Sequence, residues 1–374
     1  MLADRVRKMK LLLLALAIAA VPGTAAAAAP TPLPELDTYL AQLPLGWRQR
    51  AGDIIRQCET QSAYRIPVLI VSYFPTVGPP TAERLDPDIT GVDLLLADVR
   101  ARVAQINHHL RWALELGSTY HGLRDPSAQC SREYDIVKKV EYLEALPVSD
   151  LPGFSPGVFR PGYRQILERE DVCRFVDERG VKEVWLWGYE HGNIGPTESN
   201  MAGPNGDVSN SERVADLPVC GRTYTLYNYN YGRLLGEAIH VHGHQFEAVL
   251  GHVDRHGLFA DFVSPVGRAS PAVNSCGNVH FPPNGRFDYD WQNPAVVKTD
   301  CRHWNPQGTG KRTSVSCQTW ECREDSAATY LVWWMMNFPG RDNPLRLNGR
   351  RLRNWWAPIA DFDAAVASGK GLLR

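Results

Sequence analysis

The chain has 374 residues, of which 44% are hydrophobic and 10% aromatic, and its formal net charge at pH 7 is −1. This length and apolar content allow a large core in one elaborated domain or two intimate ones. Nothing in the charge favours nucleic acid, so we expect no nucleic-acid partner.

Residues 1–29 have the features of a secretory signal peptide. Basic residues between positions 5 and 10 precede an apolar run at 11–20, and a series of alanines follows it. The apolar run is too short for a membrane span, and no other stretch approaches about 18 uninterrupted apolar residues. We therefore predict a secreted or periplasmic protein without a membrane span in its mature form. A Pro-rich linker at 30–35 would lead into a single secreted domain at 36–374.

Eight cysteines follow this leader. An even number in an exported chain predicts disulfide bonds, although the sequence leaves their connectivity open. Cys276 with Cys301 and Cys317 with Cys322 would close short loops. No C-x2-C pair occurs, which disfavours a zinc ribbon.

The first half of the chain alternates helical and strand-like patterns. A continuous apolar, β-branched run at 66–74 predicts a buried strand, and apolar residues at 3–4 spacing predict a helix over 92–116. The polar segment 188–216 is longer than most connections, so we expect a loop that carries functional groups. Weaker patterns predict helices over 36–57 and 163–178, a strand over 181–187, and a helical or extended piece over 134–146.

The second half begins with an alternating segment at 223–231, which predicts a half-buried strand that leads into a helix from Leu234 onward. An aromatic strand is predicted over 330–338. Trp355 and Trp356 would form either a lid over the core or a surface on which sugars stack. These elements predict a mixed α/β or α+β fold in one elaborated globular domain, with a strand order that the sequence does not give.

The helix predicted after Leu234 carries a stripe of ionisable side chains. At about 100° per residue, two carboxylates and two imidazoles fall on one face. Histidines at i and i+4 can offer two nitrogen ligands from one helix to a single metal ion. A solvated polar face could have the same composition, but the flanking residues are small or apolar rather than Lys or Arg. The stripe consists of Glu237, His240, His244 and Glu247.

Two neighbours of the stripe have other predicted roles. His242 projects among the apolar residues of the helix, where a packed, hydrogen-bonded histidine is expected. Gly243 weakens a helix relative to alanine, so its place between the histidines indicates close approach by another backbone or a ligand.

Several blocks of the chain between about Val68 and Asp363 resemble those of a family of uncharacterised secreted bacterial proteins. The resemblance implies one continuous domain and an exported location, and it implies no reaction. The blocks are 185–189 (WLWGY), 198–201 (ESNM), 227–230 (YNYN), 240–247 (HVHGHQFE), 282–284 (PPN), 288–290 (DYD) and 354–356 (NWW).

Residues 238–247 also resemble the active-site helix of zincin metallopeptidases, whose motif is H-E-x-x-H. The resemblance implies that His240 and His244 are metal ligands. Val241 stands where zincins carry the glutamate that acts as general base, so a base would have to come from elsewhere, with Glu237 and Glu247 as candidates.

These patterns favour a secreted metal-dependent hydrolase. His240 and His244 would bind a divalent metal ion, with zinc expected, and Glu247, His191 or His280 would complete the site. Water bound to such an ion has a pKa near about 7, and Glu237 could accept its proton. The substrate would be an extracellular small molecule, peptide or polysaccharide. The candidate catalytic residues are Glu237, Glu247, Glu198 and His191.

Two alternatives stay open. A metal-free carbohydrate-active enzyme would use two carboxylates about 5–5.5 Å or roughly 6.5–9.5 Å apart. A non-enzymatic glycan or cell-wall binding protein would use Trp355 and Trp356 as its platform. The carboxylate candidates for the first alternative are Glu190, Glu198, Glu237, Glu247, Asp288 and Asp290.

Overall fold

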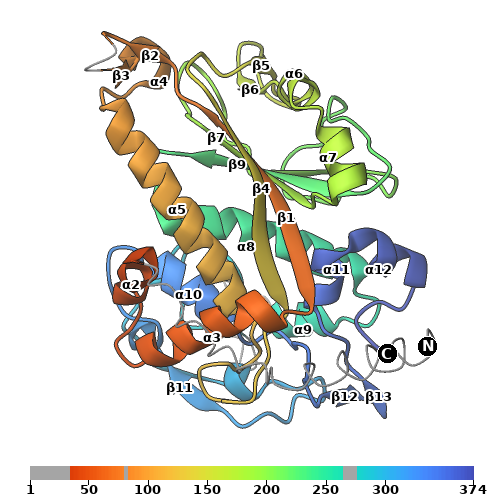
Figure 1. Ribbon diagram of the computed structural model, residues 1–374. Helices are drawn as coiled ribbons and strands as arrows, with labels where there is room; N and C mark the ends of the chain where they lie inside the picture. Colours follow the sequence, from red (N-terminus) through yellow and green to blue (C-terminus); the bar gives the residue numbers. More distant parts are fainter. Residues whose placement is uncertain (1–33, 80–82, 264–275) are drawn as a thin grey trace, which may run out of the picture. The chain divides into compact units, whose positions relative to one another are not determined.

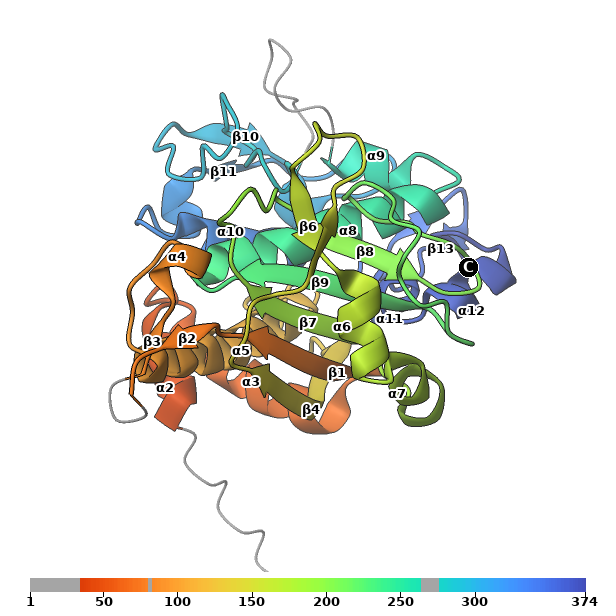
Figure 2. The same ribbon diagram turned by 90° about the horizontal axis from the view of Figure 1, so that it is seen from above.

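A five-stranded mixed sheet organises the fold, in the order β4-β1-β7-β9-β8. The structure is a computed structural model that describes residues 34–79, 83–263 and 276–374. The first four strands of the sheet are parallel, and β8 is antiparallel to β9, as the view onto the sheet in Figure 2 shows. The strands are β1 (Tyr64–Tyr73), β4 (Arg132–Tyr142), β7 (Glu183–Gly188), β8 (Ser199–Ala202) and β9 (Tyr224–Asn230).

Helices cover both faces of this sheet. Figure 1 shows α5 and α7 on opposite sides of it, and in Figure 2 α6 and α7 lie in front of the strands while α3 and α8 lie behind them. The helices are α2 (Pro34–Ala41), α3 (Arg48–Gln61), α4 (Pro87–Thr90), α5 (Leu96–Gly117), α6 (Tyr163–Arg169), α7 (Val172–Arg179), α8 (Leu235–Val253), α9 (Leu258–Val263), α10 (Ser326–Met335), α11 (Trp356–Ala360) and α12 (Phe362–Ser368).

Short antiparallel pairs and two 3-10 turns complete the described elements. The pairs are β2 (Thr76–Val77) with β3 (Arg84–Leu85), β5 (Val148–Asp150) with β6 (Phe159–Pro161), β10 (Val297–Thr299) with β11 (Thr313–Val315), and β12 (Arg346–Leu347) with β13 (Arg350–Arg351). The 3-10 turns are η1 (Cys301–His303) and η2 (Cys317–Thr319).

The predicted mixed α/β fold is confirmed, and residues 35–374 form one compact unit. The predicted signal peptide at 1–29 lies outside the described residues. So does most of the predicted linker at 30–35, whose last two residues already belong to α2.

Most elements that were predicted from periodicity are present. The predicted strand at 66–74 is β1, the strand at 181–187 is β7, and the helix at 92–116 is α5. The ambiguous segment at 134–146 is extended, as part of β4.

Each weaker predicted helix is divided into two. The segment 36–57 contains α2 and most of α3, and 163–178 contains α6 and α7. Asp171, between α6 and α7, has a φ of 51°, which a continuous right-handed helix excludes.

Three predictions for residues 188–338 are wrong: a strand at 330–338, a half-buried strand at 223–231 and a loop throughout 188–216. The segment 330–338 lies mostly in α10 rather than in a strand; all ten residues of α10 are buried, so its apolar run has no helical period to reveal it. The strand at 223–231 is buried rather than half-buried, because α8 packs on one face of β9 and Thr197 hydrogen-bonds to Asn228 on the other. The segment 188–216 is not wholly a loop, since it contains β8.

All eight cysteines form disulfides, as predicted. The bonds join Cys58 to Cys130, Cys173 to Cys220, Cys276 to Cys301 and Cys317 to Cys322. The last two are the two pairings that the sequence analysis named, and they close the shortest loops among the four bonds.

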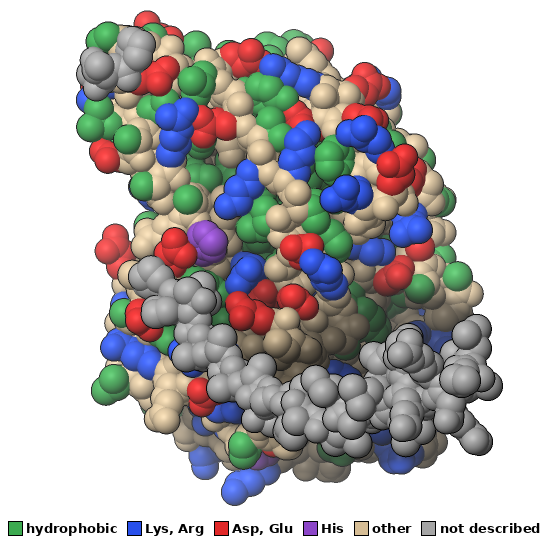
Figure 3. Space-filling view, viewed as in Figure 1, with side chains coloured by type: hydrophobic (Ala, Val, Ile, Leu, Met, Phe, Trp, Pro, Cys, Tyr) green, Lys and Arg blue, Asp and Glu red, His purple; other side chains and the backbone are tan. Residues whose placement is uncertain are grey.

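The outer surface shows no segregation of charge on the face seen in Figure 3, where acidic and basic side chains are interspersed. Within residues 34–79, 83–263 and 276–374, no helix has both the length and the apolar character that crossing a membrane requires.

Glu115, near the end of α5, is an ionisable group inside the core. Its side chain is 0% exposed, it accepts a hydrogen bond from the Tyr134 backbone N–H at 3.0 Å, and Arg111 Nε lies 3.6 Å away. Burial outweighs both contacts and raises the pKa of Glu115 to about 8.

This buried acid predicts a specific dependence of stability on pH. The folded protein retains the Glu115 proton up to about pH 8, whereas the unfolded chain loses it near pH 4.5. Rising pH between these values therefore destabilises the fold, by at most about 1.4 kcal/mol per pH unit. Thermal or urea unfolding between pH 5 and pH 8 should show this decrease as a loss of wild-type stability relative to Glu115→Gln, since the other titrating groups contribute to both proteins. Glu59→Gln, which changes the other carboxylate beside Arg111, should keep the wild-type slope; equal slopes in all three proteins would contradict the prediction.

Candidate metal centre

The candidate site depends on how α8 is oriented about its axis. One face of α8 is packed in the core, where Ile239, Phe246 and Leu250 are 0% exposed. His242 lies on this face, as predicted: its Nε2 is 2.6 Å from the Tyr229 hydroxyl, and its ring stacks on Tyr227 with centroids 3.8 Å apart. Because this face is fixed against β9, the opposite face of the helix must present its side chains away from the sheet.

On that opposite face, three imidazoles converge. The Nε2 atom of His244 lies 3.0 Å from that of His240 and 2.9 Å from that of His280. Among the described residues, these three histidines are the group that could hold a metal ion. His280 comes from the segment before β10, and it adds a third imidazole to the two that the helix provides.

A close contact between α8 and the segment before His280 brings the third imidazole into place. A Cβ on Gly243 would lie only 2.7 Å from Val279 Cγ2, so the close approach is made by a side chain and not by the backbone or ligand that was predicted. The backbone N–H of Val279 also donates to Glu247 Oε1 at 3.0 Å, and Trp291 Nε1 donates to the Val279 carbonyl at 3.2 Å. Hydrogen bonds thus fix both the backbone N–H and the carbonyl of Val279.

A carboxylate stands beside the Nδ1 atom of each imidazole. For His244 it is Glu247 Oε2 at 3.1 Å, and for His280 it is Asp288 Oδ1 at 3.6 Å. For His240 it is Glu198 Oε1 at 3.8 Å. The Glu247 contact is within hydrogen-bond distance, so it favours the His244 tautomer with the proton on Nδ1.

The separations between the nitrogens fit a single small cation. Two imidazole nitrogens at about 2.0–2.1 Å from one tetrahedral zinc are roughly 3.3 Å apart. The observed distances of 2.9 and 3.0 Å are close to that value. Glu247 contacts Nδ1 of His244 rather than the convergent Nε2 atoms, and of the three predicted candidates for completing the site it is His280 that belongs to the group that could hold a metal ion.

The electrostatic environment keeps two of the imidazoles neutral. Burial, together with the charges of His244 and His280, lowers the pKa of His240 to about 3. Burial and the neighbouring His244 also lower the pKa of His280. At His244 burial acts in the same direction, but the hydrogen bond with Glu247 and the charges of Glu198 and Glu247 outweigh it and raise the pKa. Neutral imidazole is the form that binds metal.

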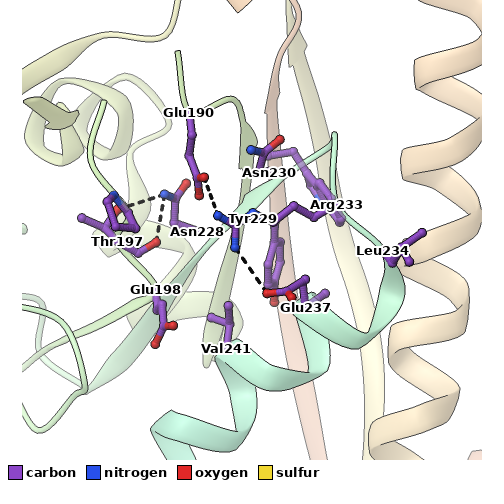
Figure 4. A pocket seen from close by; sticks show the side chains of 13 residues that line it. Glu190, Thr197, Glu198, Asn228, Tyr229, Asn230, Arg233, Leu234, Glu237 and Val241 are labelled. Atoms are coloured by element: carbon purple, nitrogen blue, oxygen red, sulfur yellow. Dashed lines mark hydrogen bonds and ion pairs between the residues drawn. The ribbon is translucent and has the colours of Figure 1, made fainter. Parts of the chain in front are cut away.

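A pocket opens beside the histidines between β7, β9 and the start of α8. Figure 4 shows Glu190 and Glu237 reaching Arg233 from two sides, at 2.6 and 3.3 Å. Glu198 lies at the edge of this pocket next to Val241, and Asn228 and Thr197 form its opposite wall. The pocket gives a polar molecule a place next to the imidazole cluster.

The predicted catalytic residues lie in different positions relative to the imidazole cluster. Glu198 Oε2 is 4.0 Å from His244 Nε2, and burial raises the pKa of Glu198. Glu237 Oε2 is 4.0 Å from His240 Nδ1 but is also paired with Arg233. His191 is exposed and lies against Gly91, so the structure does not bring it into the imidazole cluster.

Sequence reasoning missed Tyr289 as a site residue. Its hydroxyl lies 3.4 Å from His280 Nε2, and its backbone has a φ of 67°, which is uncommon for a residue with a bulky side chain. The block Asp288-Tyr289-Asp290 and the nearby His280 were the available signals; His280 was a candidate for completing the α8 site, but nothing in the sequence singled out Tyr289.

No family model, curated protein or solved structure matches the chain. The resemblances to a secreted bacterial family and to the zincin helix therefore stay predictions. Function is inferred from the chemistry of the site itself.

The three-histidine geometry predicts metal binding that needs His280 as well as the helix. His280→Ala should reduce zinc bound by the purified, untagged protein from near one equivalent to a small fraction, because two imidazoles hold zinc far less firmly than three. Elemental analysis after dialysis against a weak chelator measures this. His256→Ala removes an exposed histidine and should retain the metal; equal loss in both variants, or no zinc in the wild type, would contradict the assignment.

A second substitution tests the contact between Gly243 and Val279. Gly243→Ala should push the segment that carries His280 away from α8 and weaken zinc binding about 10-fold or more, a magnitude typical of disturbed support around a metal site. Gly251→Ala is the matched control on the same helix, since a Cβ there would meet nothing within 4 Å. The control should keep wild-type zinc affinity in a competition titration and gain about 1 kcal/mol of helix stability. Unchanged affinity in Gly243→Ala would show that this contact does not position His280.

Proposed function

We propose that this protein is an exported metal-dependent hydrolase of ester or amide bonds. The observation that carries the proposal is the convergence of three imidazole Nε2 atoms, each backed by a carboxylate, at the edge of a polar pocket. Three protein ligands with a remaining open position are typical of catalytic rather than structural zinc sites. The four disulfides support export, because such bonds persist in oxidising compartments.

The residues suited to hold the ion are His240, His244 and His280. Imidazole nitrogen suits zinc and several other first-row metals, and zinc is the ion that we propose. When bound, such an ion polarises a substrate oxygen and makes water a nucleophile near neutral pH.

Glu198 is the residue that we assign as general base. Its carboxylate lies nearer to the metal-facing side of the cluster than Glu247 does, and the Asn210 side-chain amide donates a hydrogen bond to it. Burial raises the pKa of Glu198, which makes its carboxylate a better proton acceptor. Glu237, which the sequence favoured for this role, is held by Arg233 on its exposed side.

Besides the residues that would hold the ion, the proposed hydrolysis uses two side chains, Glu198 and Tyr289. Water adds to the acyl carbon while its proton passes to the Glu198 carboxylate, and the same proton then goes to the leaving oxygen or nitrogen as the acyl bond breaks. Tyr289 is half-exposed beside His280, so its hydroxyl can donate a hydrogen bond to the developing negative charge on the substrate oxygen. The adjacent pocket, with Asn228, Asn230 and Thr197, would hold a polar part of the substrate.

The two alternatives explain less of the geometry. The platform proposed for glycan binding does not exist at Trp355 and Trp356, because both side chains are 0% exposed and pack in the core. A paired-carboxylate mechanism could use Glu198 and Glu237 beside the pocket, but it gives no role to three convergent imidazoles.

The base assignment predicts that Glu198→Gln loses hydrolysis while keeping the metal. Removal of a general base typically lowers the rate about 10²–10⁴-fold, and glutamine retains the size and hydrogen-bonding shape of the side chain. Turnover of a panel of aryl esters, anilides and short peptides should fall by that factor, with zinc content near that of the wild type. Glu212→Gln, an exposed carboxylate of the same polar segment, should retain activity.

Metal removal gives an independent check of the same function. Dialysis against a strong chelator should abolish turnover, and one equivalent of zinc should restore it. Turnover that persists without metal, or that survives in Glu198→Gln, would refute the proposal.

A further inference from the structure

A second pocket lies at the C-terminal end of α10 and shares no residue with the candidate metal centre or its pocket. Its walls come from four parts of the chain: the turn before α3, the turn after α5, η1 and the end of α10. The pocket encloses ≈ 180 Å³. The described residues that matter for its chemistry are Trp47, His121, Arg124, Arg302, Trp333 and Asn337.

Two guanidinium groups face this pocket without an acidic partner among the described residues. Arg124 Nη2 donates to the backbone carbonyl of Arg302 at 2.7 Å, and neither arginine takes part in an ion pair. The neighbouring Asp125 carboxylate instead accepts hydrogen bonds from the backbone N–H and hydroxyl of Ser127, at 2.8 and 2.6 Å. The pocket therefore has an uncompensated positive charge.

The positive charge of the two arginines also shifts the pKa values of neighbouring groups. Burial lowers the pKa of Arg302, and burial together with the charge of Arg302 lowers the pKa of Arg124. Burial and the charges of Arg124 and His303 lower the pKa of His121 to about 3, so this imidazole is neutral at pH 7. An anion in the pocket would relieve the repulsion between the exposed Arg124 and the half-buried Arg302.

The remaining walls are apolar and aromatic. Trp333 is 5% exposed and Met336 is 4% exposed, while Trp47 and Leu123 are partly buried. The carbonyl oxygens at the end of α10, which would repel an anion, are already occupied: Trp333 accepts from Asn337 Nδ2 at 2.7 Å, and Met336 accepts from the His121 backbone N–H at 2.8 Å.

We propose that this pocket binds a small organic anion, with a carboxylate or phosphate group on the two arginines and an aromatic ring against Trp47 and Trp333. Arginine presents several N–H donors that match the oxygens of either anion. A cavity of about 150 Å³ in a protein core can hold benzene, so the observed volume suits one ring and its anionic substituent. The proposal stands independently of the hydrolase function.

Isothermal titration calorimetry with benzoate, phenyl phosphate and the neutral analogue benzamide tests this inference on the full chain. At least one of the two anions should bind with a millimolar or lower Kd, and the preferred anion identifies which oxyanion the arginines select. Benzamide should bind about 10-fold more weakly or not at all, because it lacks the charge-assisted hydrogen bonds. The proposal is overturned if neither anion binds at about 10 mM, or if benzamide binds as tightly as the anions.

Variants locate the binding. Arg302→Gln should weaken the preferred anion about 10-fold or more, and it should fold, since the Arg302 guanidinium makes no hydrogen bond in the described structure. Arg124→Gln is a second variant with the same expected direction, and the exposed Arg174→Gln should leave the Kd unchanged. His280→Ala should also retain the affinity, which separates this pocket from anion binding at the candidate metal centre. Unchanged affinity in both pocket variants, or its loss in His280→Ala alone, would show that the anion binds elsewhere.

Discussion

The packing of one face of α8 against β9 is the constraint on which the candidate site depends. A helix has a single rotational position once one face is buried, and here Phe246, Ile239 and the hydrogen-bonded His242 fix it. Their burial directs His240 and His244 to the opposite face, where Glu247 then contacts His244 Nδ1 and Glu198 lies beside His240. Large apolar side chains contribute roughly 1.5–3 kcal/mol each when fully buried, which is ample to fix this orientation against a few partly exposed polar groups.

A second constraint acts between distant parts of the chain. The absence of a side chain at Gly243 lets Val279 approach α8, and Glu247 binds both the Val279 backbone N–H and His244 Nδ1. One carboxylate therefore connects the orientation of a helical histidine with the position of the segment that carries His280. In the candidate metal centre, Glu247 would therefore support the imidazoles from beside them.

The imidazole cluster brings three nitrogen atoms together at a partly buried position. The Nε2 atom of His244 lies 3.0 and 2.9 Å from those of His240 and His280, and burial disfavours the charged form of His240. A cation that binds the folded protein and not the unfolded chain stabilises the fold in proportion to its affinity. The two arginines at the end of α10 present the opposite case, in which clustered positive charge favours an anion. Both sites place like groups together, and a ligand of the opposite character would relieve each of them.

The sequence by itself determined which residues of α8 share a face. Successive residues of a helix are rotated by about 100°, so the helical period placed His240 and His244 on one face and His242 in the core. The sequence also determined that the cysteines pair, from their number and the exported leader that it predicts. Only the tertiary structure decided the third ligand, since His280 lies 36 residues from His244 and reaches it through contacts that no local pattern encodes. The tertiary structure likewise decided that the apolar segment of α10 is a helix, because a segment buried on all sides has no amphipathic period to read.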